Sequence, residues 1–223
     1  MILVNIQNIS KTYMENKIAY NALSGITLEI PNGGFIALSG PSGSGKTTLL
    51  NLIGCLDRPS SGSIFFGTDE VSRLPQKDLT NVRLKKIGFV FQDYNLIPTF
   101  SALENVEYIL WLQGVEEGER RRRSLEALQR FGMEKLSHRR PAQLSRGQQQ
   151  RVAVSRAIVH KPQILLGDEL TANLDHKTAA ELMHFLTRLN EDDGTTFVYA
   201  THDPEMVAMA HQVVLIRDGK RVG

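Results

Sequence analysis

The chain has 223 residues, of which 41% are hydrophobic and 22% charged, as in an ordinary globular protein with a substantial core. Its formal net charge of +2 does not indicate a nucleic-acid-binding surface. Its one cysteine, Cys55, excludes an internal disulfide and favours a reduced, cytosolic environment. No apolar run is long enough to span a bilayer, so a membrane role would depend on partner chains.

Short strands dominate the first part of the chain. Residues 2–6 and 26–30 alternate apolar with polar side chains, which predicts two half-exposed strands and not a signal peptide. An apolar run over residues 35–38 predicts a buried strand. Two further short strands are predicted over residues 64–66 and 87–91.

The pattern becomes helical over residues 94–160, with amphipathic helices predicted around residues 103–112 and 125–131. The charged run GERRRR at residues 118–123 is typical of a solvated helix face, with lipid head groups as the alternative contact. Strands separated by helices favour a parallel sheet covered on both faces. Apolar strands return over residues 164–166, 196–200 and 213–216.

A Gly-rich segment between the strand at 35–38 and a predicted helix matches the pattern G-x-x-x-x-G-K-[ST]. Glycines let such a loop curl so that its N–H groups face phosphate oxygens. Lys46 would place a positive charge near the β and γ phosphates, and the Thr47 hydroxyl can ligate Mg²⁺. The predicted nucleotide-binding residues here are Gly40, Ser42, Gly43, Ser44, Gly45, Lys46, Thr47 and Thr48.

Two carboxylates, Asp168 and Glu169, follow the apolar strand predicted over residues 164–166. We expect Asp168 to hold Mg²⁺ and Glu169 to act as a general base on water. An Asp-Glu pair after a strand can also simply cap a helix. The phosphate loop upstream favours the catalytic interpretation.

A Ser/Gly turn, Leu144–Gln148, opens a helix shortly before these carboxylates. Its hydroxyl and its N–H groups at a helix N-terminus form a natural phosphate site. We expect this turn to lie too far from Asp168 and Glu169 to serve one nucleotide. The separation suggests that two chains share each ATP.

These segments, in this order, resemble the nucleotide-binding subunit of an ABC transporter over essentially the whole chain. The family's signature, usually LSGGQ, is here LSRGQ at residues 144–148. Further family positions are matched by Tyr13 in SKTY, Gln92 in GFVFQ, His202 in VYATHD and the loop from Ala172 to Asp175.

The resemblance implies a head-to-tail dimer in which each ATP lies between one phosphate loop and the other chain's signature. Ser145 and Gly147, beside Gln148, would bind the γ-phosphate of the partner's ATP. Asp175 would link the two sites. The implied catalytic residues are Glu169, His202 and Gln92, the implied Mg²⁺ ligands are Thr47, Gln92 and Asp168, and Tyr13 would stack on adenine.

The implied fold class is α/β, a P-loop NTPase (RecA-like) core with an N-terminal antiparallel β subdomain and an inserted all-helical subdomain. Residues 1–223 would form a single ATPase domain. Residues 1–92 and 162–223 would be the core with its β subdomain, and residues 93–161 the helical signature subdomain.

Finer resemblance points to the branch of macrolide-exporter, lipoprotein-release and cell-division ATPases. The implied protein is an ATPase that drives an integral-membrane subunit for export or extrusion, bound peripherally to the cytoplasmic side of the inner membrane. Residues 94–100 would lie near the partner's docking groove, although about half of their apolar side chains could equally be core. The alternative is a cell-division-type signalling ATPase without a transported substrate. A soluble ATPase acting on DNA or ribosomes, or a P-loop kinase, fits the motifs poorly.

Four positions depart from this branch: Arg146 stands for Gly, Gly167 for Ala, Leu170 for Pro and Ala172 for Gly. The Leu170 change is expected to loosen the loop backbone, and Gly167 to weaken the strand slightly. None removes a functional atom. We expect a competent but slow ATPase.

Overall fold

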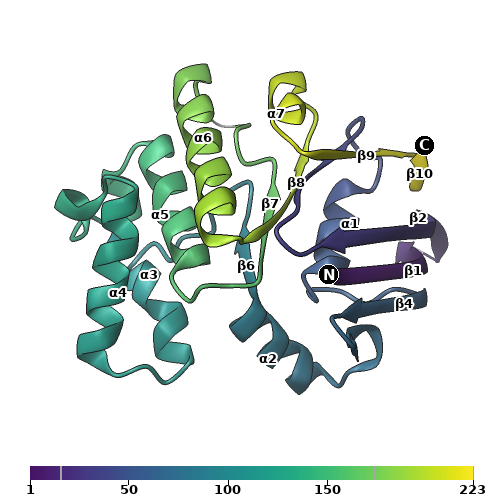
Figure 1. Cartoon of the computed structure of the whole chain (residues 1–223), viewed down its shortest axis with the longest axis horizontal. Helices are drawn as coiled ribbons and strands as arrows, with labels where there is room; N and C mark the ends of the chain where they lie inside the picture. The colour runs from purple at the N-terminus through teal and green to yellow at the C-terminus, as the bar shows by residue number, and fades with distance from the viewer. Residues whose placement is uncertain (16, 173, 223) are drawn as a thin grey trace.

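Two β-sheets and a set of helices form the part of the computed structural model that is described, residues 1–15, 17–172 and 174–222 (Figure 1). The strands are β1 (Ile2–Glu15), β2 (Ile18–Pro31), β3 (Phe35–Ser39), β4 (Ser61–Phe66), β5 (Asp69–Glu70), β6 (Ile87–Val90), β7 (Ile164–Asp168), β8 (Thr196–Thr201), β9 (Gln212–Arg217) and β10 (Lys220–Val222). The helices are α1 (Lys46–Ile53), α2 (Gln76–Lys86), α3 (Ala102–Leu112), α4 (Glu117–Arg130), α5 (Arg146–Ile158), α6 (His176–Asp193) and α7 (Pro204–Ala208), with 3₁₀ turns at Val71–Arg73, Glu134–Leu136 and Pro141–Gln143.

The larger sheet has the strand order β10-β9-β3-β8-β7-β6, and the smaller has the order β2-β1-β4-β5. Neighbours from β9 to β6 pair in parallel. The pairs within the smaller sheet are antiparallel. The predicted α/β class with an antiparallel β subdomain is therefore confirmed. Because parallel strands end at the same edge of a sheet, the carboxyl ends of β3, β7 and β8 lie together.

The two faces of the larger sheet belong to two hydrophobic clusters, because successive side chains of a strand point to opposite faces. In β3, Ile36 and Leu38 pack into the cluster that contains α1 and the smaller sheet. Phe35 and Ala37 pack into the cluster that contains side chains of α5 and α6. All four are fully buried. The cluster that β3 shares with α1 and the smaller sheet fixes the position of α1, the helix after the phosphate loop.

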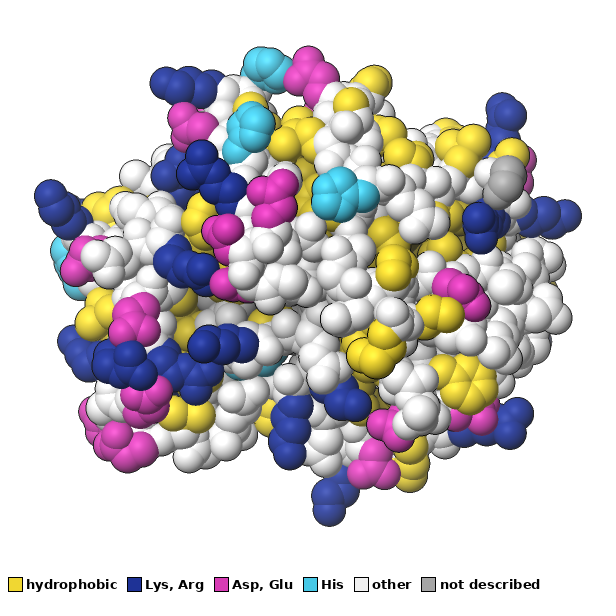
Figure 2. All heavy atoms as spheres, in the orientation of Figure 1, with side chains coloured by type: hydrophobic (Ala, Val, Ile, Leu, Met, Phe, Trp, Pro, Cys, Tyr) yellow, Lys and Arg dark blue, Asp and Glu magenta, His cyan; other side chains and the backbone are white. Residues whose placement is uncertain are grey.

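The helical insertion, α3 to α5, lies to one side of the larger sheet (Figure 1). Figure 2 shows Lys and Arg side chains gathered over this part, interspersed with Asp and Glu. Within the charged run, Arg122 pairs with Glu119 at 2.8 Å and with Glu126 at 2.6 Å. Arg122 is exposed, whereas Arg123 is half-buried and donates to the Val159 carbonyl at 2.9 Å. The run is thus largely a solvated, internally paired helix face.

Helix α2 was not predicted from the sequence. Leu79 is its one buried residue, so no apolar stripe marks it as a helix. Among the described residues no helix is both long and apolar enough to cross a bilayer. The division of the chain at residues 93 and 161 stays a prediction.

Candidate active site

The phosphate loop, residues 40–45, joins β3 to α1 with a backbone that only glycine tolerates at key positions. Gly40 has φ 151° and Gly45 has φ 105°. A Cβ on Gly40 would lie 2.1 Å from the Ile216 carbonyl oxygen, and one on Gly45 2.7 Å from that of Ala22. No side chain fits at either position, so the curled loop lies directly against the core, with its following residues at the N-terminus of α1.

Two side chains of the loop are disposed to meet an anion. Lys46 is 6% exposed, and its ammonium donates to the Gly40 carbonyl at 2.8 Å and to the Pro41 carbonyl at 3.0 Å. The Ser44 hydroxyl is buried, and no hydrogen-bond partner is found for it among the described residues. Buried polar atoms are normally paired, but Ser44 is not among the residues that line the neighbouring cavity, so its phosphate contact stays a prediction.

Asp168 at the end of β7 lies next to the loop. The Thr47 hydroxyl donates to Asp168 Oδ1 at 3.1 Å. Burial raises the pKa of the Asp168 carboxyl, and the hydrogen bond from Thr47 opposes this rise. A hydroxyl and a carboxylate are oxygen ligands of the kind that Mg²⁺ prefers. In the described part of the chain no three His, Cys, Asp or Glu side chains could hold a metal together. A Mg²⁺ ion held by Thr47 and Asp168 would take its other ligands from water and substrate phosphates.

Glu169 and His202 follow the neighbouring strands β7 and β8. His202 Nδ1 lies 2.9 Å from Glu169 Oε1. The Glu169 backbone has φ 47°, an unusual conformation for a residue with a side chain, and its N–H donates to the Ala200 carbonyl at 3.1 Å. Two side chains suited to proton transfer and phosphate contact are therefore held together by a direct contact.

A cavity of about 560 Å³ brings many predicted site residues together. Its lining holds most of the phosphate loop with Thr47 and Thr48, and from distant segments Tyr13, Gln92, Glu169 and His202. The sequence reasoning missed Tyr20, which lines the cavity and pairs directly opposite Tyr13 in the β1-β2 register. The signal for Tyr20 lay in the hairpin register, since residues opposite each other share one face of a sheet.

The signature residues lie elsewhere. Ser145 caps α5: its hydroxyl accepts from the Gln148 N–H at 3.3 Å, and its own N–H donates to the Gln148 side chain at 2.9 Å. Asp175 caps α6 by accepting from the Thr178 N–H at 3.0 Å. None of Ser145, Gly147, Gln148 and Asp175 lines the cavity. Asn173, which belongs to the predicted loop after Glu169, lies outside the described residues.

Two of the four positions at which the chain departs from its branch, Gly167 and Leu170, lie against each other. A Cβ on Gly167 would lie 2.6 Å from Cδ1 and 2.7 Å from Cγ of Leu170, which is buried. Gly167 therefore leaves room for the larger Leu170 side chain, and the two changes form one packing unit. Arg146 is exposed in the first turn of α5, and Ala172 is exposed at the cavity.

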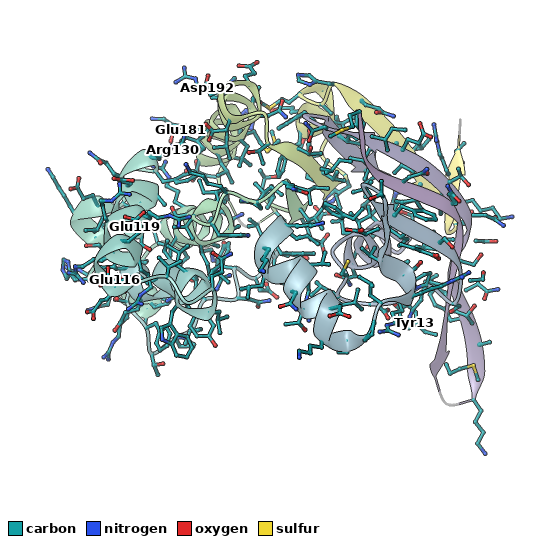
Figure 3. The ribbon with its side chains drawn as sticks, turned by 60° about the horizontal axis from the view of Figure 1, so that its bottom comes forward. Tyr13, Glu116, Glu119, Arg130, Glu181 and Asp192 are labelled. Atoms are coloured by element: carbon teal, nitrogen blue, oxygen red, sulfur yellow. The ribbon has the colours of Figure 1, made fainter. Side chains whose placement is uncertain are left out.

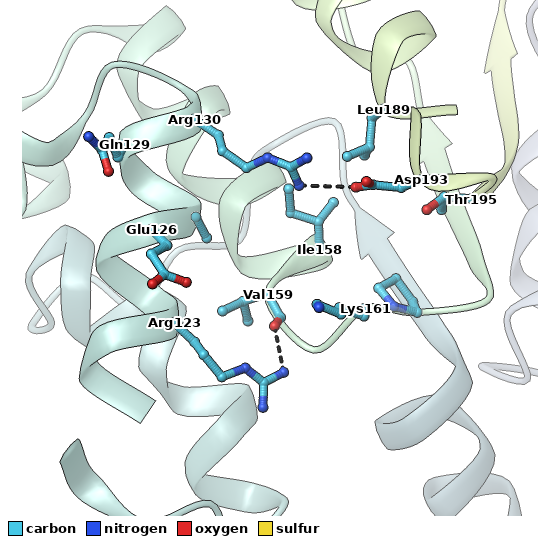
Figure 4. Close-up of a pocket in the computed structure, with 12 residues that line it drawn as sticks. Arg123, Glu126, Gln129, Arg130, Ile158, Val159, Lys161, Leu189, Asp193 and Thr195 are labelled. Carbon is cyan, nitrogen blue, oxygen red and sulfur yellow. Dashed lines mark hydrogen bonds and ion pairs between the residues drawn. The ribbon is translucent and has the colours of Figure 1, made fainter. Parts of the chain in front are cut away.

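A second hollow, of about 660 Å³, lies where α4, the end of α5 and the end of α6 meet (Figure 4). Its arginines are already engaged: Arg130 pairs with Asp193 at 3.1 Å, and Arg123 donates to the Val159 carbonyl. It has no Gly-rich loop among its lining residues. This hollow lacks the features that make the smaller cavity a phosphate site.

Comparison with known proteins agrees with this geometry. The family model described as ABC transporter matches residues 23–172. The uncharacterized ABC transporter ATP-binding protein MJ0796 of Methanocaldococcus jannaschii is 43% identical over 222 residues, covering 98% of this chain and 94% of that protein. The macrolide export ATP-binding/permease protein MacB of Syntrophobacter fumaroxidans is 45% identical over 221 residues, covering 98% of this chain but 31% of MacB.

Solved structures are similar over nearly the whole chain. The dimeric structure of a post-hydrolysis state of the ATP-binding cassette MJ0796, bound to ADP and Pi, has a TM-score of 0.93 at 43% identity and covers 99% of this chain and 97% of that one. The structure of cbiO1 from Clostridium perfringens, part of the complex cbiONQ, has a TM-score of 0.88 at 31% identity, with coverage of 100% and 87%.

Proposed function

The chain belongs to the ABC transporter family as an ATP-binding and ATP-hydrolysing subunit, and from this premise we propose that two copies act head to tail. In this arrangement each ATP lies between the phosphate loop of one copy and the signature turn of the other. The dimeric MJ0796 structure bound to ADP and Pi supports a nucleotide-bound dimer.

One observation carries the proposal: the phosphate loop and Glu169 line one cavity, whereas Ser145 and Gly147 do not. A single chain therefore contributes to two composite sites. It gives the phosphate loop and Glu169 to one site, and Ser145 and Gly147 to the other. Ser145 and the N–H groups at the start of α5 would bind the γ-phosphate of the partner's ATP. ADP lacks that phosphate, so release of the cleaved phosphate after hydrolysis removes the contact that joins the copies.

The cavity residues divide the chemistry. Glu169 accepts a proton from the attacking water as the water oxygen bonds to the γ-phosphorus and the bond to the β-γ bridging oxygen breaks. His202, held beside Glu169, contacts the γ-phosphate, and Lys46 neutralises charge on the β and γ phosphates. Tyr13 stacks on adenine.

Thr47, Asp168 and Gln92 would hold Mg²⁺, which when bound supplies charge neutralisation to the phosphates. Thr48, Ser42 and Ser44 complete the phosphate contacts, and Asp175 links the two sites across the dimer.

We further propose that the dimer drives an integral-membrane subunit from the cytoplasmic side of the membrane, for export or extrusion. The MacB relatives, in which a chain of this kind is a third of an ATP-binding/permease protein, support this assignment. The helical insertion, residues 93–161, would form the docking surface, with residues 94–100 near the groove. A cell-division-type signalling role differs only in whether the partner moves a substrate.

Sedimentation of a Glu169→Gln variant tests the dimer. With ATP and Mg²⁺ the variant should bind nucleotide without turnover and sediment as a dimer, and with ADP as a monomer. A matched Lys46→Met, Glu169→Gln variant should stay monomeric because it does not retain ATP. A monomer in saturating bound ATP would contradict the composite site.

A further inference from the structure

Tyr13 lies on β1 at the edge of the nucleotide cavity, far from Glu116 and Glu119 at the start of α4 (Figure 3). Its hydroxyl donates to Asp57 Oδ2 at 2.8 Å. The other oxygen of the same carboxylate accepts from the Lys11 ammonium at 2.7 Å and from the Arg58 N–H at 2.7 Å. Both oxygens of the Asp57 carboxylate are thus hydrogen-bonded, and one of them holds the Tyr13 hydroxyl.

Lys11 contacts the ring as well. Its ammonium lies over the Tyr13 ring, 4.8 Å from the centroid, and also donates to the Arg58 carbonyl at 2.8 Å. Only 12% of the Lys11 side chain is exposed. Lys11 does not line the cavity, whereas Tyr13 does. In the stacking proposed above, adenine would meet the ring face opposite the ammonium.

Asp57 also connects this arrangement to the phosphate loop. It follows α1 closely, and its N–H donates to the Asn51 carbonyl of that helix at 3.3 Å. Burial alone would raise the pKa of Asp57, but the hydrogen bonds from Lys11 and Tyr13 outweigh it and lower the pKa below its ordinary value. The tyrosine ring is therefore connected through Asp57 to the helix that begins at Lys46.

We propose that Lys11 and Asp57 are positioning residues for base recognition, which hold the Tyr13 ring at the angle and distance from the phosphate loop that adenine requires. The proposal rests on the stacking role of Tyr13 in the proposed function. Neither Lys11 nor Asp57 lines the cavity, so both act through Tyr13. The Lys11 and Asp57 side chains are only 12% and 32% exposed, so thermal unfolding of each variant has to be measured beside its binding.

The test compares the affinities of the purified full chain for ATP and for inorganic tripolyphosphate, which has no base. Asp57→Ala and Lys11→Met should each weaken ATP binding about three- to tenfold, part of the stacking contribution, and leave tripolyphosphate binding unchanged. Tyr13→Phe removes the same hydrogen bond as Asp57→Ala and should weaken ATP binding by a similar factor. The Tyr13→Phe, Asp57→Ala double variant should lose less than the sum of the two single changes.

A matched control lies between the end of α2 and the smaller sheet. The Lys86 ammonium is 5.5 Å from the Phe66 ring centroid and pairs with Asp69 at 3.5 Å, away from the cavity. Lys86→Met removes the same kind of contact and should change neither affinity.

Equal weakening of both ligands by Asp57→Ala would overturn the proposal, because Asp57 would then act on the phosphate loop itself. Unchanged ATP binding in Asp57→Ala and Lys11→Met would also overturn it, provided that Tyr13→Ala weakens ATP binding. If Tyr13→Ala binds ATP as tightly as the unmodified chain, the stacking role in the proposed function fails, and this inference fails with it.

Discussion

His202 Nδ1 lies 2.9 Å from Glu169 Oε1, so the base proposed for catalysis is held by direct contact with a side chain from the next strand. The two residues follow neighbouring parallel strands, β7 and β8, whose carboxyl ends lie at the same edge of the larger sheet. The hydrogen bond from the Glu169 N–H to the Ala200 carbonyl ties the two strand ends together. This pairing fixes the carboxylate at the cavity that also receives the phosphates.

Glu169→Gln should lower the rate of ATP hydrolysis about 100- to 1,000-fold, because the amide cannot accept the proton of the attacking water. His202→Ala should lower kcat more than it changes the affinity for ATP. Steady-state hydrolysis and equilibrium ATP binding measure the two effects. The exposed pair His176 and Glu205, with His176 Nδ1 3.4 Å from the Glu205 carboxylate, is the control, and His176→Ala should leave kcat unchanged. An active Glu169→Gln variant would remove Glu169 from the mechanism.

Ser145→Ala should have two effects, because Ser145 caps α5 and also faces the partner's nucleotide in the proposed dimer. Loss of the cap should lower the free energy of unfolding by about 1 kcal/mol. Loss of the phosphate contact should weaken ATP-driven dimerisation. Thermal unfolding and sedimentation of the Glu169→Gln background measure the two separately.

Ser101 offers the matched control for Ser145. It caps α3 with the same capping box, its hydroxyl accepting from the Glu104 N–H at 3.2 Å. Ser101→Ala should lower stability similarly and leave dimerisation unchanged. Equal loss of dimerisation in both variants would mean that Ser145 acts only through helix stability.

Gly167→Ala should destabilise the chain by about 1–2 kcal/mol, since the new methyl would meet the buried Leu170 side chain. Leu170→Ala should lower stability by creating a cavity. If the two positions form one packing unit, the double variant should lose less than the sum of the single changes. Denaturant unfolding of all three variants gives the coupling, and additive losses would contradict the packing unit.

Stability should fall between pH 6.5 and pH 4 because of His160. Burial lowers the pKa of His160 to about 4, while its ring Nε2 lies 3.2 Å from the Ile87 carbonyl oxygen. Between these pH values His160 is protonated in the unfolded chain and neutral in the folded chain. The stabilisation present above pH 6.5 is therefore lost as the pH falls towards 4. The loss should be about 2–3 kcal/mol by denaturant unfolding.

His160→Gln should flatten this pH dependence, and His184→Gln, at an exposed position on α6, should not. The same slope in the His160→Gln variant would assign the acid sensitivity to other groups.

The sequence predicted the elements whose signal is local. Glycines of fixed spacing mark the phosphate loop, and apolar runs mark β3, β7 and β8, whose carboxyl ends then bring Asp168, Glu169 and His202 together. The resemblance to ABC transporters added Tyr13 and Gln92, which the structure places at the same cavity.

The residues and contacts that the sequence did not predict depend on packing between distant segments. Tyr20 faces the cavity because of the hairpin register, and Asp57 reaches Tyr13 through a loop that follows α1. The contact of Gly167 with Leu170 needs the turn at Glu169, whose φ of 47° no motif predicts. Helix α2 has no apolar periodicity, so its position is set by tertiary packing.

The central claim is that the carboxylates and the signature turn of one chain serve different ATP molecules. Mixed dimers of the purified full chain, isolated with two affinity tags, test it by hydrolysis. Glu169→Gln and Ser145→Arg on different copies should leave one intact composite site and measurable turnover. The same two changes on a single copy, paired with an unmodified copy, should abolish turnover. Activity in the second pairing and none in the first would contradict the account.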